Sequence, residues 1–405
     1  MHFVGIDWAD DHHDCVVLDA TGKRAGSLHV AHTADGLEKL VAFLQGVGGE
    51  EADLEQLACI VETSHGLLIG ALLEAGLPVY PVNPETVDRH RKPSGAKTDA
   101  IDAYLLARTG RSDLADLRRL TPDNPLIAEL KLLTRDQDGL IQSQTRLVNQ
   151  LTACLKAYYP TALTLFTKLQ QRCTLAFLRA FPTLQQARAA SKEQMVAVLK
   201  AAGHSGAEAK AQEIQQKLAQ PALQARAEVT RAKTRLMLSL VGQVELHLQD
   251  LDAYDAEITR LFLSHSDSKV FASLPRAKTR IAPRLLAEWG DDRGRYAAVA
   301  SVQALAGTSP VVFQSGRLRK VHRRYACSKP FRNVLYQFAR QSIQKEAWAA
   351  EYYQHKRAAG KSHSMALRAL ANQWVRIIFA LWLKQEPYDA AVFLAAQEAH
   401  APRAA

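Results

Sequence analysis

The sequence predicts a mixed α/β domain at its N-terminal end, followed by an all-α middle region and a mostly helical C-terminal region. Strand and helix patterns alternate over residues 2–112. Strand patterns then stop, and residues 120–265 carry apolar residues at helical spacing. The chain of 405 residues is long enough for two or three domains.

Five short strands are predicted in the N-terminal domain. They are expected at residues 3–7, 14–19, 58–62 and 77–82, with one more after the turn at 20–23. Helices are expected over 35–45 and around 67–74, the latter ending before Gly76. An antiparallel start followed by alternating strands and helices is typical of a ribonuclease-H-like (RuvC-like) domain. In that fold the first strand, the fourth strand and the last helix meet at one cleft.

Two long helices are predicted in the middle region. Their apolar seams are Leu140, Leu147, Leu151 and Leu155 in one, and Val229, Leu236, Leu240, Val244, Leu248 and Leu251 in the other. We expect the pair to form an antiparallel coiled coil. Residues 183–220, with a break at 203–206, predict a helical hairpin inserted at its tip. A plain core-forming bundle and an arm that oligomerises or holds nucleic acid both fit this pattern.

Charge is divided unevenly along the chain. The net charge is +10, but residues 1–115 hold 9 Lys and Arg against 18 Asp and Glu, a net of −9. The remainder holds 42 basic and 23 acidic residues, a net of +19. We therefore expect the later two thirds of the chain to attract nucleic-acid phosphates, and the first third not to.

The composition also excludes several classes of protein. No apolar stretch approaches the roughly 18 residues of a membrane span, and the N-terminus lacks a targeting pattern, so a soluble intracellular protein without membrane contact is expected. The five cysteines are Cys15, Cys59, Cys154, Cys173 and Cys327. Their spacing suggests neither a disulfide framework nor a zinc site.

Four carboxylates stand at positions typical of a metal-dependent nuclease. Asp7 and Glu62 each end a predicted strand, and Asp99 and Asp102 lie three residues apart on one helical face. Four negative charges in one place require a compensating cation, for which Mg²⁺ is the first candidate. Taken singly, Asp7 could merely end an edge strand and Asp99 could stabilise a helix N-terminus.

A long basic segment lies in the C-terminal region. Between Arg293 and Lys345 there are eleven basic residues and no acidic one. The candidate nucleic-acid contacts within it are Arg317, Arg319, Lys320, Arg323, Arg324, Lys329 and Arg332. A charge run is usually a solvated face, but one of this length would repel itself unless a polyanion neutralised it.

A serine lies inside this basic segment. Ser315 follows the apolar residues 310–313 and precedes Gly316. Cations around a hydroxyl can stabilise both its alkoxide and an attacked phosphate, which is the chemistry of a nucleophile. From the local sequence alone, the simpler interpretation of Ser315 is a turn residue.

These residues together carry a family resemblance that covers nearly the whole chain. The matching features, in order, are Gly5-Ile6-Asp7, Val61-Glu62-Thr63 with Gly66, Val82-Asn83-Pro84, the segment 97–103 containing Asp99 and Asp102, and the segment 306–310 leading to Ser315-Gly316. In this order and spacing the chain resembles the DEDD insertion-sequence transposases of the IS one-ten type, relatives of the Piv DNA invertases.

The resemblance implies a site-specific recombinase with a composite active site. Asp7, Glu62, Asp99 and Asp102 would bind metal, and Ser315 would become joined to a DNA strand. The implied partners are DNA, a guide (bridge) RNA and further copies of the chain, as a dimer to tetramer, in the cytoplasm of a bacterial or archaeal cell. The implied domains are 1–115 (catalytic), 116–265 (coiled coil), 266–390 (transposase domain carrying the serine) and 391–405 (flexible tail).

One segment departs from the family pattern. Where the family usually has a Pro-Gly-x-Gly turn, this chain has Leu274-Pro275-Arg276-Ala277-Lys278. Because both glycines are absent, Arg276 and Lys278 would have to contact phosphate through their side chains. The helical insertion at 183–220 is also longer than in some members.

Three rival functions remain open on the sequence. A metal-dependent nuclease or junction resolvase would use water instead of Ser315. A sugar kinase or actin-like ATPase would need a glycine-rich turn after Asp7, where Trp8-Ala9-Asp10 stands. A non-catalytic nucleic-acid scaffold would account for the basic segment but not for the four carboxylates.

Overall fold

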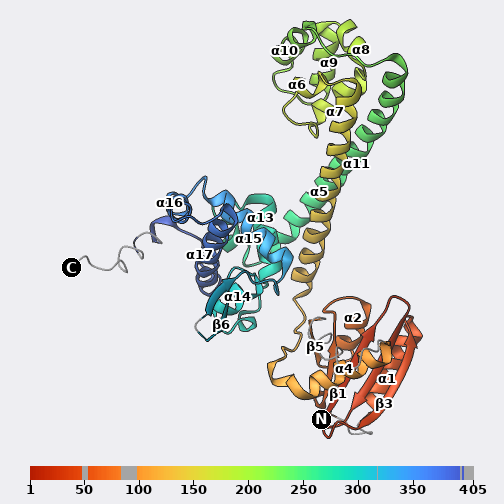
Figure 1. The fold of residues 1–405 in the computed structure, drawn as a ribbon, viewed down its shortest axis with the longest axis vertical. Coiled ribbons are helices and arrows are strands. Elements are labelled where there is room, and N and C mark those ends of the chain that lie inside the picture. The colour runs from red at the N-terminus through yellow and green to blue at the C-terminus, as the bar shows by residue number, and fades with distance from the viewer. Residues whose placement is uncertain (48–52, 84–97, 317, 393–394, 396–405) are drawn as a thin grey trace, which may run out of the picture. The chain divides into compact units, whose positions relative to one another are not determined.

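The structure, a computed structural model, describes residues 1–47, 53–83, 98–316, 318–392 and 395. It divides into two compact units, Met1–Pro122 and Asp123–Ala405 (Figure 1). The second unit contains both the middle and the C-terminal regions that the sequence distinguishes. The expected tail at 391–405 lies almost wholly outside the described residues, as do Pro84 and Lys97 of the family motifs.

The first unit is built on a five-stranded mixed sheet with the order β3-β2-β1-β4-β5. The strands are β1 His2–Trp8, β2 His12–Leu18, β3 Arg24–Ala31, β4 Leu57–Val61 and β5 Val79–Pro81. β1 pairs antiparallel with β2 and parallel with β4, while β3 and β5 complete the two sides. The five predicted strands and their antiparallel start are thus confirmed.

Two helices cover one face of this sheet. α1 (Ala34–Gly46) is capped by Thr33, whose hydroxyl accepts a hydrogen bond from the Gly36 amide, and α2 (Leu67–Glu74) follows β4. Alternate residues of β1, Val4 and Ile6, are fully buried against the apolar side chains of both helices. Burial of this face fixes the register of β1 and therefore the face on which its other residues lie.

A third helix packs on the opposite face, where Gly5 and Asp7 lie. α4 (Asp99–Asp113) is capped by Thr98, whose hydroxyl oxygen accepts a hydrogen bond from the Ile101 amide. A Cβ atom on Gly110 would lie 2.1 Å from Ile60 of β4, so only glycine allows so close an approach of helix and sheet. The acidic first turn of α4 is thereby fixed next to the central strands.

Two long helices form the spine of the second unit. α5 (Pro125–Tyr158) is capped by Asn124 and starts with proline at its first position, and α11 (Ala227–Ser264) packs alongside it (Figure 1). At 34 and 38 residues, each spans roughly 50 Å or more. The prediction of two paired helices is confirmed, while their supercoiling stays a prediction.

A cluster of short helices joins one end of this pair. Its members are α6 Ala162–Leu165, α7 Arg172–Ala180, α8 Leu184–Ala189, α9 Lys192–Ala201 and α10 Ala207–Ala219. The break predicted at 203–206 lies between α9 and α10, which pack together as expected. Helices α6 and α7 were not predicted, and they share one apolar core with the rest of the cluster and with the ends of α5 and α11.

The other end of the pair is enclosed by the C-terminal helices. They are α12 Ser268–Ala272, α13 Lys278–Trp289, α14 Val299–Leu305, α15 Lys329–Ser342, α16 Ala347–Ala358 and α17 His363–Lys384. Their core is aromatic: Trp289, Trp374 and Trp382 are fully buried. Such large apolar surfaces stabilise the region without any disulfide, and all five cysteines are free.

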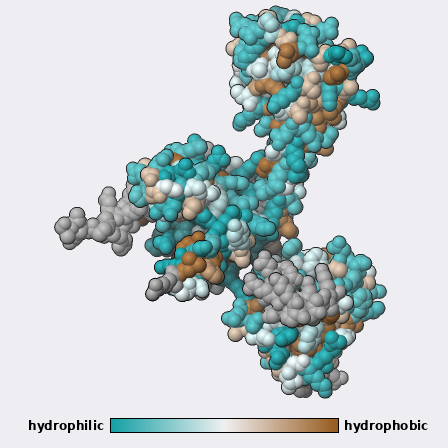
Figure 2. Space-filling view, in the orientation of Figure 1, coloured by the Kyte–Doolittle hydropathy of each residue, from teal (hydrophilic) through white to brown (hydrophobic). Residues whose placement is uncertain are grey.

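A two-stranded antiparallel hairpin projects from this helical core. It consists of β6 (Val311–Ser315) and β7 (Leu318–His322), and every residue of both strands is exposed. The sequence predicted a mostly helical region here and did not predict these strands. Figure 2 shows brown, hydrophobic surface in this part of the second unit.

Among the described residues, no helix combines the length and the apolar character that crossing a membrane would require.

Candidate active site

The structure brings the four predicted acids of the first unit to one end of the sheet. Asp7 is the penultimate residue of β1, and Glu62 directly follows β4. Because β1 and β4 run parallel, their carboxyl ends meet at the same edge. Asp99 and Asp102 come from the first turn of α4, which packs on β1 and β4.

The electrostatics of Asp7 reflect this convergence. Burial is the largest cause that raises its pKa from 3.8 to about 6. The charges of the other three acids raise the pKa further, Asp102 most, followed by Asp99 and Glu62. Asp7 therefore lies within electrostatic reach of all three, and one cluster of negative charge exists at this edge.

The acids differ in their exposure. Asp102 is buried, with 5% of its surface accessible, whereas Glu62 is half-buried. The Asp99 side chain is 53% exposed and lies 3.1 Å, Oδ2 to Nε2, from His12. The cluster is therefore open to solvent on the Asp99 side and closed on the Asp102 side.

Three side chains that sequence analysis did not single out form a second group, and one of them, His12, contacts Asp99. His12 and Asp14 come from β2 and His29 from β3. Their nitrogen and oxygen atoms lie within 4.8 Å of one another. The signal available in the sequence was the alternation His12, Asp14 on one face of a strand, but the partner His29 comes from another strand.

Ser315 lies in the second unit, at the end of β6. It pairs with Leu318 across a two-residue turn, and Gly316 in this turn has a φ of 56°. Positive φ at this position is typical of tight hairpin turns and explains the glycine after the serine. Ser315 is exposed at the tip of the hairpin.

Ser315 shares its face of the hairpin with apolar and cationic side chains. The strand register places Phe313, Leu318 and Lys320 on this face, because cross-strand partners point to the same side. Phe313 and Leu318 are 56% and 48% exposed. A serine between exposed apolar groups and a lysine is suited to contact a large partner rather than to stabilise the fold.

The predicted basic residues are distributed around this hairpin. Arg319 and Lys320 are exposed in β7, Arg323 and Arg324 follow it, and Lys329 is the first residue of α15. Arg332 is half-buried, and its guanidinium lies 3.7 Å from the Cys327 sulfur. Arg317 lies outside the described residues.

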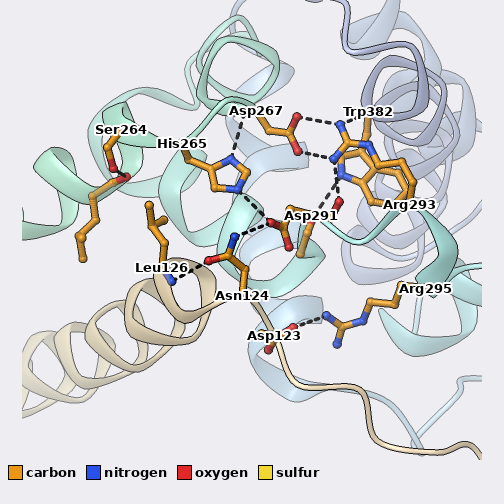
Figure 3. Close-up of polar contacts among 12 residues, drawn as sticks. Asp123, Asn124, Leu126, Ser264, His265, Asp267, Asp291, Arg293, Arg295 and Trp382 are labelled. Atoms are coloured by element: carbon orange, nitrogen blue, oxygen red, sulfur yellow. Dashed lines mark hydrogen bonds and ion pairs between the residues drawn. The ribbon is translucent and has the colours of Figure 1, made fainter.

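Two other cations of the basic segment are neutralised within the chain. The Arg293 guanidinium donates to both carboxylate oxygens of Asp267, at 2.5 and 2.7 Å, and lies over the Trp382 ring (Figure 3). Arg295 donates to Asp123 at 2.7 Å. The prediction that the whole segment needs an external polyanion is therefore wrong for these two residues, because acids distant in sequence pair with them.

A pocket at the base of the hairpin adds cations that sequence analysis missed. Its volume is about 310 Å³, and β7 contributes His322 to its lining while Arg323 follows. Three more cations line the same pocket: Lys356 from α16, Lys361 from the turn after it and Arg368 from α17. These residues are 33 or more positions away from Arg323, so their proximity is not visible in the sequence.

The departure at residues 274–278 has a structural counterpart. Arg276 has a φ of 58°, a left-handed conformation that glycine adopts without strain. Its guanidinium donates to the Gln344 side chain. The backbone of this turn therefore has a conformation suited to glycine even though the side chain is arginine.

Two family models match the chain. The DEDD transposase model of the IS110 type, described as a transposase, matches residues 4–160. The model described as transposase of the IS116/IS110/IS902 family matches residues 268–354. The first match contains the four acids, and the second contains Ser315 and the hairpin.

Curated relatives match over most of the chain. A putative mini-circle transposase for IS117 from Streptomyces coelicolor is 29% identical over 92% of both chains. An uncharacterised 42 kDa protein of insertion element IS900 from Mycobacterium paratuberculosis is 26% identical over 97% of this chain and 98% of its own. A putative transposase from Sinorhizobium fredii is 30% identical over 49% of this chain and 56% of its own length.

Proposed function

Because this chain belongs to the IS110/IS116 family of transposases, we propose that it cuts and rejoins DNA with two chemical groups, a metal-binding acid cluster and a serine nucleophile. The observation that carries the proposal is the convergence of Glu62, Asp99 and Asp102 on Asp7. Carboxylates gathered this closely repel one another, which favours a bound cation at this place.

The sheet of the first unit supports a ribonuclease-H-like domain. Its order β3-β2-β1-β4-β5, with only β2 antiparallel to its neighbours, gives the arrangement that sequence analysis expected. The acids follow the first and fourth strands and begin the helix on β1, where that fold has its cleft.

The donor set of the cluster fits hard divalent cations. All four side chains offer carboxylate oxygens, which Mg²⁺ prefers. The raised pKa of Asp7 reflects its burial first and then the neighbouring negative charge, which a cation would offset. When bound, such ions supply Lewis-acid activation of a phosphodiester. The four acids would hold and orient them, and the burial of Asp102 would limit water at the closed side.

Ser315 would act as the nucleophile. Its hydroxyl oxygen attacks the scissile phosphorus, a serine–phosphate bond forms, and the bond from phosphorus to the leaving DNA oxygen breaks. The serine proton passes to solvent, and the leaving oxygen gains one. Because the phosphodiester energy is kept in the serine linkage, attack by another DNA hydroxyl rejoins the strand and frees Ser315.

The cations around the hairpin would hold the nucleic-acid backbone. Arg319, Lys320 and Arg323 pair with no carboxylate among the described residues, and the pocket residues Lys356 and Arg368 extend the same basic surface. A guide RNA and a dimer to tetramer, with the acids of one subunit serving the serine of another, complete the proposal. These last elements are supported by the family resemblance, as is action in the cytoplasm.

The proposal is tested by trapping the covalent intermediate. Labelled DNA carrying the element ends is incubated with protein, guide RNA and Mg²⁺, then analysed under denaturing conditions. Wild type and Gln314→Ala, which changes the neighbouring exposed residue on the other hairpin face, should give a protein–DNA adduct. Ser315→Ala should give none, and neither should Asp7→Asn.

An undiminished adduct with Ser315→Ala would exclude this serine as the nucleophile. Cleavage by wild type without any adduct would favour the alternative function, a metal-dependent endonuclease or junction resolvase in which water attacks.

A further inference from the structure

A row of polar side chains continues from the acid cluster across the sheet. Asp14 of β2 is the register partner of Asp7 on one side and of His29 on the other. His12 precedes Asp14 by two residues, so it lies on the same face. This is the face covered by α4, whose Asp99 reaches His12.

The ligand atoms of this row point toward a common place. The His29 Nδ1 lies 3.1 Å from an Asp14 oxygen, and the His12 Nε2 lies 3.8 Å from the same oxygen. The two imidazole rings are 5.0 Å apart between centroids. In a tetrahedral site with bonds of about 2.0–2.1 Å, neighbouring ligand atoms are roughly 3.4 Å apart. Small side-chain rotations would bring the three groups to that spacing.

The other nitrogen of His12 is already oriented for ligation. The His12 Nδ1 lies 2.7 Å from an Asp11 carboxylate oxygen, within hydrogen-bond distance. The His12 Nε2 faces the oxygens of Asp99 and Asp14, at 3.1 and 3.8 Å. A carboxylate behind the histidine is also the usual outer partner of a metal-bound imidazole.

We propose that His12, Asp14 and His29 form a binding site for Zn²⁺ or a similar first-row transition-metal ion, with Asp99 as a fourth ligand. Imidazole nitrogens suit such ions better than Mg²⁺, which prefers oxygen. The site is therefore chemically distinct from the all-carboxylate cluster beside it. Asp99 stands in both, since it belongs to the acid cluster and contacts His12.

Sharing Asp99 has a regulatory consequence, which rests on the proposed function. An ion held by the histidines would draw Asp99 away from the catalytic metal ions. Zinc should then inhibit Mg²⁺-dependent cleavage through this site.

The site itself is tested by metal binding without any nucleic acid. Full-length protein is titrated with Zn²⁺ by calorimetry and with Co²⁺ by visible absorption, which reports nitrogen and carboxylate ligation. Wild type should bind one ion with nitrogen ligation, in addition to any ion held by the acid cluster, and His29→Ala should bind that ion about 10-fold more weakly or worse. The His29 side chain is 64% exposed, so this variant should fold, which thermal unfolding without metal checks.

His2→Ala is the matched control, because His2 lies at the opposite end of β1 and should not affect binding. Equal binding by wild type and His29→Ala, or no binding by wild type, would overturn the site. Asp7→Asn should keep the Co²⁺ absorption.

The inhibition is tested separately. Added Zn²⁺ should inhibit DNA cleavage by wild type more strongly than cleavage by His29→Ala, and equal inhibition would refute the sharing of Asp99. If the chain binds Co²⁺ through His29 yet never cleaves DNA, the proposed function fails while the metal site stands.

Discussion

Gly5 of β1 lies directly against Ala103 of α4: a Cβ atom on Gly5 would be 1.9 Å from the Ala103 carbonyl oxygen. This contact sets the distance between the strand that carries Asp7 and the helix that carries Asp99 and Asp102. We therefore expect Gly5→Ala to force α4 away from the sheet, to destabilise the protein by about 3 kcal/mol and to abolish cleavage.

Urea unfolding measures this effect. Gly70→Ala in α2 is the control, because a Cβ atom there meets nothing within 4 Å and alanine favours a helix by about 0.5–1 kcal/mol. Equal stability of the Gly5 variant and wild type would contradict the close packing.

The raised pKa of Asp7 predicts a pH-dependent effect on stability. Its folded-state pKa of about 6 exceeds the ordinary 3.8, so the stabilisation from binding this proton is complete below pH 3.8 and is lost as the pH rises through 6. At neutral pH without metal, the ionised carboxylate is destabilising. After a discount for the solvent exposure of Asp7, Asp7→Asn should stabilise the metal-free protein by about 1 kcal/mol.

Thermal unfolding of Asp7→Asn and wild type in the presence of a chelator, above and well below pH 6, measures their difference in stability. This difference should vanish at the lower pH. Added Mg²⁺ should raise the melting temperature of wild type and not of Asp7→Asn. If Asp7→Asn were less stable than wild type at neutral pH, the ionised Asp7 carboxylate would not be destabilised by burial and by the neighbouring acids.

The buried ion pair of Arg293 predicts a large loss of stability. The Asp267 side chain is only 2% exposed, so Arg293→Ala leaves an uncompensated buried charge and should cost about 3–5 kcal/mol. Arg319→Ala removes an exposed cation of the same segment and should change stability by less than about 0.5 kcal/mol. Chemical unfolding of the two variants distinguishes structural cations from those available to nucleic acid.

Cations around the hairpin predict a salt-dependent affinity for DNA or RNA. Lys320→Ala or Arg368→Ala should weaken binding and reduce the slope of log affinity against log salt by about 0.9 for each phosphate that the variant no longer neutralises. Arg260→Ala is the control, since Arg260 is paired with Glu257 on α11. If the Lys320 and Arg368 variants left the slope of log affinity against log salt unchanged, this surface would be excluded as the nucleic-acid-binding surface.

The left-handed Arg276 predicts a stabilising substitution. Arg276→Gly should relieve about 1 kcal/mol of backbone strain. It also removes the hydrogen bond to Gln344, so Gln344→Ala is the variant that isolates this loss. Arg276→Gly should be more stable than Gln344→Ala in thermal unfolding, and the opposite order would show that the side chain outweighs the strain.

The first unit was predictable because its strands and helices obey simple periodicities. Val4 and Ile6 alternate with Gly5 and Asp7, and this alternation predicts which face is buried and which carries the acid. The hairpin β6–β7 was missed because neither of its faces is buried, so no alternation marks it. Short exposed strands are specified by pairing and turn geometry, which a local pattern does not show.

The partners of the cations and histidines are harder to predict from the sequence, for a related reason. Arg295 pairs with Asp123, 172 residues earlier, and His29 faces Asp14 from a separate strand. Such partners are determined by the fold, and the sequence around each residue contains no trace of them. A run of like charge predicts one surface, but the structure divides this run into cations paired with acids of the same chain and exposed cations.

The exposed hairpin has a consequence for evolution. Since no residue of β6 or β7 contributes to a buried core, nearly any side chain can be exchanged there without unfolding the molecule. Selection at these positions then acts on binding by the hairpin tip and not on the folding stability of the chain. A lineage of mobile elements could diversify its partners at this hairpin while the aromatic interior behind it remains the same.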